Sequence, residues 1–187
     1  MLKFKKITIT TKRKRQFVKV IFFKDEVGIE GQVFSAKLTK ETNQMLSKSL
    51  GTAISGLIPH LLYSTNLTDS SIKLDANMDY PKWFREGHYA DDKRFDNMAV
   101  TSIEFIGKEG LDAVKIFGYK ETEWTDKPFK VKLETPVINL DRVPENHYAL
   151  VAILDEQIDD IIKGIEDFLE KGDTLSKAQQ AELELTY

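Results

Sequence analysis

Residues 129–136 read Phe-Lys-Val-Lys-Leu-Glu-Thr-Pro, and this short stretch decides the class of fold. Its apolar residues alternate with charged ones, which predicts a strand with one buried face and one face in water. Pro136 lacks the N–H that a strand ladder needs, so we expect pairing to end there. Farther along, residues 148–171 are predicted to form a helix that ends before Gly172. Its apolar stripe consists of Leu150, Leu154, Ile158, Ile161, Ile165 and Phe168.

Strand patterns also precede this stretch. Strands are predicted over residues 100–106 and 113–119, joined by a turn at 107–110 whose glycines tolerate positive φ. The N-terminal part repeats the order, with strands predicted over 4–10, 17–23 and 27–34 and a turn at Asp25-Glu26. A helix is predicted to follow from about Thr39, and Pro59 should kink or end it.

The pattern as a whole predicts an α+β fold with mostly antiparallel strands and helices gathered on one face. We expect two strand-strand-strand-helix units, over residues 1–63 and 99–172, joined by an irregular connector over 64–98. Residues 173–187 are expected to form an acidic terminal helix or tail. The two units either pack with pseudo-twofold symmetry or build one compact domain, which suits a chain of 187 residues.

Composition excludes several classes of protein. No run approaches 18 apolar residues, so we expect no transmembrane span, and no apolar segment follows the basic N-terminus as a secretory signal requires. The absence of cysteine excludes disulfides, thiolate metal sites and cysteine nucleophiles, and it suits a reducing compartment.

Charge is distributed unevenly along the chain. Residues 1–48 hold twelve Lys/Arg and four Asp/Glu, whereas residues 145–187 hold three and eleven. This asymmetry indicates a polyanionic partner for one end and an acidic surface or tail at the other. Two other interpretations remain open: the two ends neutralise each other within one fold, or each is a solvated face.

The first candidate site is a basic hairpin tip. It consists of Lys12, Arg13, Lys14 and Arg15. These side chains are expected to neutralise phosphates in a salt-sensitive and sequence-independent way. Lys3, Lys5, Lys19 and Lys24 would extend the tip if they share a face. The C-terminal helix is acidic, so we do not expect it to enter the major groove of duplex DNA.

The second candidate site lies in the connector. Its members are Lys82, Trp83, Phe84, Arg85 and Tyr89, with Tyr80 nearby. Aromatic faces beside cations are the components of a stacking site for single-stranded nucleic acid. They are also the components of a protein-interface anchor, or of a small satellite core that a long loop folds onto its domain.

No catalytic signature is present. His60, His88 and His147 belong to no zinc-binding motif, and the glycines at 51 and 56 lack the lysine of a phosphate-binding loop. The sequence Asp91-Asp92-Lys93 is faintly similar to the carboxylates and lysine of metal nucleases, but it lies among loop residues. We therefore expect no enzymatic activity, no metal and no cofactor.

The C-terminal half resembles a family of small, uncharacterised bacteriophage proteins from early or DNA-metabolism gene clusters. The resemblance runs from Ala99 to the end and rests on residues 131–136, the acidic helix and the closing Lys-Ala-Gln-Gln-Ala-Glu-Leu-Glu-Leu of residues 177–185. It implies a viral origin and a setting in the host cytoplasm. It identifies no functional residue.

These observations predict a non-enzymatic phage protein that binds single-stranded nucleic acid, or a nucleoprotein complex, during replication or recombination. One alternative is a protein-interaction module that inhibits or redirects a host defence factor through its acidic surface. Another is a structural component of the virion. No membrane partner is expected, and homo-oligomerisation is left open. A shared placement of the basic tip and the connector aromatics would favour nucleic acid, whereas an exposed acidic helix would favour the protein partner.

Overall fold

The computed structural model describes residues 2–12, 15–27, 33–45, 48–64, 95–107, 112–122, 128–141 and 148–170. The first half contains strands β1 (Leu2–Lys12), β2 (Arg15–Val27) and β3 (Val33–Met45), then helices α1 (Lys48–Ser55) and α2 (Ile58–Ser64). The second half contains strands β4 (Met98–Ile106), β5 (Ala113–Thr122), β6 (Phe129–Glu134) and β7 (Ile138–Asn139), then helix α4 (Tyr148–Glu170).

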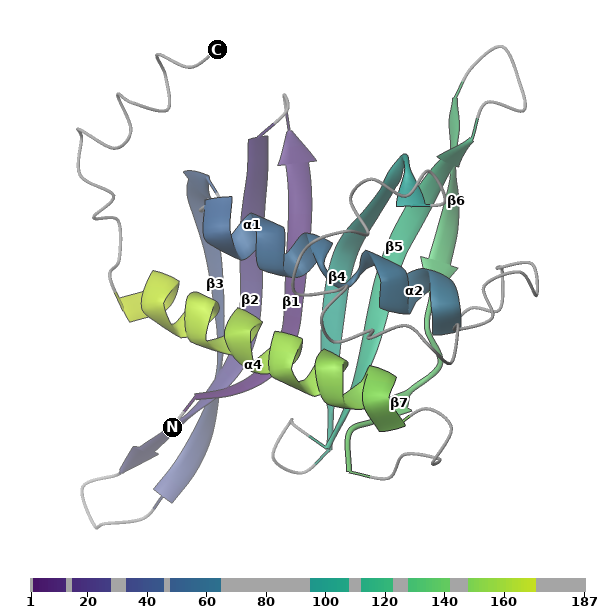
Figure 1. The fold of residues 1–187 in the computed structure, drawn as a ribbon. Helices are drawn as coiled ribbons and strands as arrows, with labels where there is room; N and C mark the ends of the chain where they lie inside the picture. The colour runs from purple at the N-terminus through teal and green to yellow at the C-terminus, as the bar shows by residue number, and fades with distance from the viewer. Residues whose placement is uncertain are drawn as a thin grey trace.

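All of these strands belong to one antiparallel sheet of seven strands (Figure 1). Their order is β3-β2-β1-β4-β5-β6, and β7 pairs with β5. The first strands of the two predicted units, β1 and β4, pair at the centre through Ile7 and Ile103. The α+β class with antiparallel strands is therefore confirmed, while the pseudo-twofold relation between the units stays a prediction.

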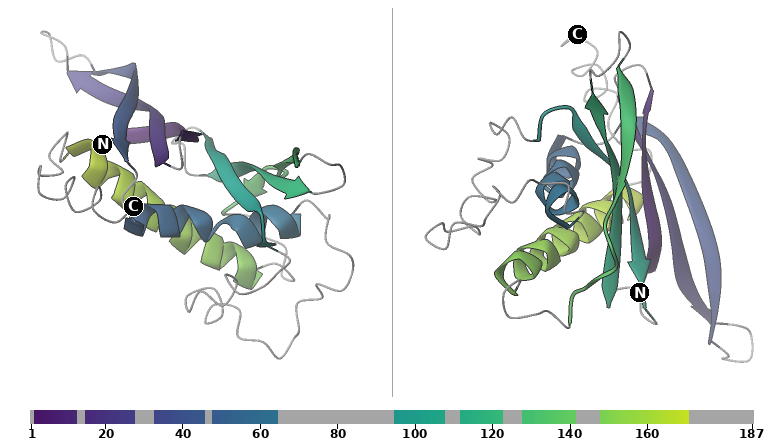
Figure 2. Two further views of the ribbon diagram at one scale, coloured as in Figure 1. Left: turned by 90° about the horizontal axis from the view of Figure 1, so that it is seen from above. Right: turned by 90° about the vertical axis from the view of Figure 1, so that its right-hand side faces the viewer.

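The helices all lie on one face of the sheet (Figure 2), and the core fills the space between the two layers. Fully buried side chains come from the sheet and from α2 and α4 alike. They include Ile7, Val20, Ile103, Ile116, Leu61, Leu154, Ile158, Ile161 and Ile165. The predicted stripe of α4 is confirmed at its four central positions, because each of those side chains is buried against the sheet.

The end of β6 follows the sequence prediction. The regular ladder stops at Glu134, one residue before Thr135-Pro136. Thr135 nevertheless keeps both hydrogen bonds to Ile116 of β5: its N–H donates to the carbonyl oxygen at 2.9 Å, and its Oγ1 accepts from the N–H at 3.0 Å. The buried hydroxyl thus satisfies a backbone donor that would otherwise lose its partner.

Two glycines mark positions where a side chain does not fit. Gly107 follows β4 with a φ of 124°, as the predicted turn requires. Gly118 lies in β5 on the helix side, directly beneath Leu61 of α2. A Cβ at Gly118 would clash with that leucine and with the carbonyl oxygen of Ala99, so the close contact between α2 and the sheet depends on glycine.

The N-terminal half differs from the prediction at three places. The strand predicted over 27–34 is wrong, because Val27 ends β2, Val33 begins β3, and the two residues pair with each other across the ladder. The turn predicted at Asp25-Glu26 is absent, because both residues pair with β3 and β2 continues to Val27. The helix predicted from Thr39 is also wrong: β3 extends to Met45, and α1 begins at Lys48. The long ladder with β2 overrides the local preference of a polar segment that by itself resembles a helix start.

Pro59 was predicted to kink or end a helix. The helix does break near this proline, but the break lies before Pro59 and not at it. Helix α1 already ends at Ser55, and α2 starts at Ile58. Pro59 therefore sits in the first turn of the new helix, where the missing N–H has no intrahelical acceptor to lose.

Candidate nucleic-acid interface

The face of the sheet opposite the helices, here called the open face, carries the candidate site. Residues that pair directly across an antiparallel ladder share a face. Ile103 and Ile116 pair on the helix side, so the neighbouring pairs Glu104–Lys115 and Ser102–Phe117 point the other way. The same alternation in β1 and β2 places Lys6 with Ile21, and Thr8 with Lys19, on the open face.

Aromatic side chains occur on this face in both halves of the sheet. Phe17 and Phe23 come from β2, and Phe117 and Tyr119 come from β5. All four are half-buried, and Ile21 lies between the first two. These positions alternate with the buried Val18, Val20 and Phe22 of the same strand, which explains why residues 20–23 are apolar without interruption.

Lysines surround these rings. The open face carries Lys3, Lys6, Lys19, Lys37, Lys115, Lys130 and Lys132. Several of these lysines form ion pairs. Among the described residues, Lys3 Nζ lies 3.6 Å from Asp25 Oδ2, Lys6 Nζ lies 2.5 Å from Glu104 Oε1, and Lys115 Nζ lies 3.3 Å from Glu134 Oε1. Their charges are thus partly compensated within the protein.

Three lysine ammonium groups also lie over aromatic rings. Lys6 Nζ and Lys115 Nζ are 5.4 Å and 5.1 Å from the ring centroid of Phe117. Lys130 Nζ is 4.1 Å from the ring centroid of Tyr119. All three distances are within the range of a cation–π interaction, so both rings of β5 lie in contact with lysines.

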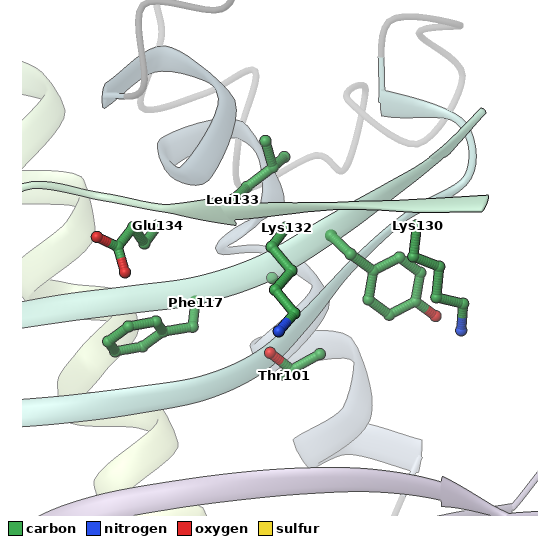
Figure 3. Close-up of a pocket in the computed structure, with 8 residues that line it drawn as sticks. Thr101, Phe117, Lys130, Lys132, Leu133 and Glu134 are labelled. Atoms are coloured by element: carbon green, nitrogen blue, oxygen red, sulfur yellow. The ribbon is translucent and has the colours of Figure 1, made fainter. Parts of the chain in front are cut away.

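A pocket of about 440 Å³ opens on this face above β4, β5 and β6 (Figure 3). Its lining residues are Thr101, Phe117, Gly118, Tyr119, Lys130, Lys132, Leu133 and Glu134. In Figure 3, Lys132 extends from β6 toward Thr101, while Leu133 points the opposite way. Leu133 is part of the core between the sheet and the helices. The alternation of residues 129–134 therefore places lysines in the pocket and Leu133 in the core.

The helix side has the opposite charge. Helix α4 contains seven carboxylates and one lysine, whereas the strands contain thirteen Lys/Arg and six Asp/Glu. Asp155, Glu156, Asp159 and Asp160 are all exposed. Partial burial, together with the charges of Asp159, Asp141 and Glu156, raises the pKa of Asp155. The strands are thus net basic and α4 is net acidic, although the open face also carries the carboxylates of Asp25, Glu104, Glu121 and Glu134.

One histidine is buried between the helices. His60 Nε2 donates a hydrogen bond to Gln157 Oε1 at 2.6 Å, and Gln157 Nε2 donates to the carbonyl oxygen of Gly56 at 3.3 Å. Burial lowers the pKa of His60 to about 4, and the hydrogen bond to Gln157, which by itself raises this pKa, offsets only part of the effect. His60 is therefore neutral at physiological pH and joins α2 to α4.

The residues predicted from sequence lie mostly outside the described part of the chain. Lys12 and Arg15 form the last pair of the β1–β2 ladder, so the predicted tip is at the end of this hairpin. Arg13 and Lys14 of the tip, and Lys82, Trp83, Phe84, Arg85 and Tyr89 of the connector, lie outside the described residues. Whether the tip and the connector share a surface therefore stays a prediction.

Four further lysines were expected to extend the tip if they shared a face. Lys3 and Lys19 do lie on the open face, whereas Lys24 pairs with Leu2 on the other side and Lys5 sits at a register shift. The rings and lysines of β5 and β6 were not predicted as a site. The sequence feature that could have revealed them is the alternation of residues 129–133. It indicated a solvent-exposed strand face, but it did not show which residues lie next to that face.

No metal site or membrane span is found among the residues that the structure describes. They contain no group of three or more His, Asp or Glu side chains that could hold a metal ion. No helix among them is both long and apolar enough to cross a membrane. Comparisons of this chain with protein-family models, with curated proteins and with solved structures find no match.

Proposed function

We propose that this protein binds single-stranded nucleic acid on the open face of its sheet, without catalysis. The observation that carries the proposal is the surface formed by lysines and half-buried rings on the side of the sheet that no described helix covers. Ammonium groups attract phosphates, and aromatic rings stack with bases of any sequence. Sheets that bind RNA in other proteins use aromatic side chains on a strand face in the same way.

The arrangement of charge supports single strands over duplex DNA. Helix α4 is the longest helix described and is acidic, so it would be repelled by a phosphate backbone. The open face of a sheet can hold an unpaired strand whose bases are free to stack. We further propose the setting that the phage resemblance implies: replication or recombination in the host cytoplasm.

The proposal is tested by fluorescence anisotropy with a labelled oligothymidylate of about 20 nucleotides. With about four phosphates neutralised, affinity should fall about 50-fold between about 50 and 200 mM salt. The double variant Lys37→Ala/Lys132→Ala removes one lysine from each half of the open face and should weaken binding about tenfold. Lys163→Ala removes the exposed lysine of α4 and serves as the matched control, with unchanged affinity expected.

Two results would contradict the proposal. One is the absence of binding at low salt, and the other is binding that does not respond to salt. Either result would leave the second candidate function, a module that inhibits or redirects a host protein. The exposed carboxylates of α4 favour that candidate, because Asp155, Glu156, Asp159 and Asp160 lie within six residues of one helix and can contact a basic partner.

The connector gives a separate prediction. If Trp83 stacks on a base, Trp83→Ala should weaken oligothymidylate binding about tenfold and leave the thermal unfolding midpoint unchanged. Anisotropy and circular dichroism measured on the same sample check both parts. A lowered midpoint with unchanged affinity would instead indicate that Trp83 belongs to a satellite core.

A further inference from the structure

The two rings of β5 on the open face differ in what covers them. Phe117 lies beneath two ammonium groups, from Lys6 and Lys115, at 5.4 and 5.1 Å. Each of these lysines also forms an ion pair, with Glu104 and Glu134 respectively. A base that stacked on Phe117 would therefore have to disturb two cation–π contacts whose cations are already held in place by carboxylates.

Tyr119 is covered differently. The ammonium group of Lys130 lies 4.1 Å from its centroid, and Lys132 is its direct partner across the β5–β6 ladder. Both lysines are exposed, and neither forms an ion pair with a carboxylate of the described residues. Glu121 pairs with Lys130 across the same ladder, but no ion pair joins the two, so both lysines remain available beside the ring that is easiest to uncover.

A nucleotide that enters the pocket can exchange partners with Lys130. The contact between one exposed ammonium and a tyrosine ring is weaker than the stacking of a base on an aromatic side chain. A base can therefore replace Lys130 on Tyr119, and the released ammonium remains within reach of the phosphate of the same nucleotide. Lys132, on the same side of β6, supplies a second cation.

Resting on the function proposed above, we infer that the pocket above β4, β5 and β6 is the nucleotide subsite of this protein. The base stacks on Tyr119 in place of Lys130, and Lys130 and Lys132 bind the phosphate. Phe117 lies on the same face but stays covered by Lys6 and Lys115, so it does not stack on a base. Every base has a face that can stack on an aromatic ring, so we expect this subsite to accept any base.

Matched substitutions on neighbouring positions test this inference by anisotropy with the same oligothymidylate. Tyr119→Leu should weaken binding about tenfold, because it removes the stacking surface but keeps an apolar side chain. Tyr119→Phe retains the ring and should bind within about twofold of wild type. Phe117→Leu, two residues away on the same strand face, should also change affinity less than about twofold.

The two lysines should separate in their salt dependence. Lys132→Ala should weaken binding at every salt concentration and reduce the slope of log affinity against log salt by about 0.7. Lys130→Ala should reduce the slope by the same amount, yet bind at high salt as well as wild type or better, because the base no longer has to displace a cation. Circular dichroism shows whether each ring variant folds. If one does not, the two lysine variants still test whether a base displaces Lys130 from Tyr119.

The outcomes distinguish the subsite from the function. If Phe117→Leu is as damaging as Tyr119→Leu, or if Lys130→Ala behaves like Lys132→Ala at high salt, the assignment to Tyr119 is wrong while nucleic-acid binding stands. If the wild-type protein does not bind the oligonucleotide, both the subsite and the proposed function are overturned.

Discussion

Gly118→Ala should destabilise the protein by about 3 kcal/mol, which is a large part of the stability of an ordinary domain. The added Cβ would clash with Leu61 Cδ2 of α2 and with the carbonyl oxygen of Ala99 in β4. A leucine side chain can rotate away, but a carbonyl oxygen held within a ladder cannot. The strand or the helix must therefore move, and the core between α2 and the sheet loosens. Urea unfolding followed by circular dichroism measures the change.

Gly164→Ala is the matched control for this prediction. Gly164 lies in the middle of α4, where its added Cβ would meet only Leu50 Cδ1, at 3.0 Å. Alanine also favours the helix by about 1 kcal/mol over glycine, which offsets the tight contact. We expect a net change within about 1 kcal/mol. If both variants are destabilised equally, the clash with the Ala99 carbonyl oxygen is not the reason that position 118 requires glycine.

Acidification should destabilise the protein through His60, by about 2 kcal/mol between pH 7.5 and pH 5. The pKa of His60 is about 4 in the folded state and has the ordinary value of 6.5 in the unfolded chain. Between these values the unfolded chain binds the proton and the folded protein does not. Stability from this group is therefore complete above pH 6.5 and is lost as the pH falls toward 4.

His60→Gln tests the prediction, because its amide can still donate to Gln157 Oε1 but does not titrate. The stability difference between wild type and this variant should change by about 2 kcal/mol between pH 7.5 and pH 5. The carboxylates of α4 contribute equally to both proteins and cancel in the difference. The raised pKa of Asp155 alone would act in the opposite direction, favouring the folded state on acidification. A difference that is constant with pH would show that His60 is not buried as the neutral form.

The second half of the fold was predicted closely from sequence. The predicted strands at 100–106, 113–119 and 129–133 and the helix at 148–171 correspond to β4, β5, β6 and α4, with ends that differ by up to three residues. Their periodicity is strong because each element buries one face against the same core. Thr135-Pro136 was also read correctly as the end of the β6 ladder, since a missing N–H acts locally.

The first half of the fold was harder to predict from sequence, because its strands are long and contain residues that favour a turn or a helix start elsewhere. Asp25 and Glu26 favour a turn locally, yet both lie within the β2–β3 ladder. Thr39 favours a helix start, yet it pairs with Ile21. The long β2–β3 ladder stabilises extended backbone in both strands. A short segment of sequence contains only one of these strands, so its local pattern does not reveal this stabilisation.

The candidate interface was only partly predictable. The alternation in β6 indicated that Lys130 and Lys132 face water, but no local pattern could place Tyr119 beneath Lys130. Lys6 and Glu104, which pair across β1 and β4, are 98 residues apart in the chain. Contacts of this kind depend on strand register, which only the assembled sheet defines.

By itself the amino-acid sequence determined the α+β class, the apolar stripe of α4, the end of β6 and the separation of basic from acidic segments. Each of these follows from residues close together in the chain, through periodicity, a missing N–H or composition. Only the tertiary structure decided that the basic strands and the acidic helix α4 form two separate layers, and which rings and lysines share the open face. The physical reason is that strand pairing brings distant residues together and assigns every side chain to one of two faces.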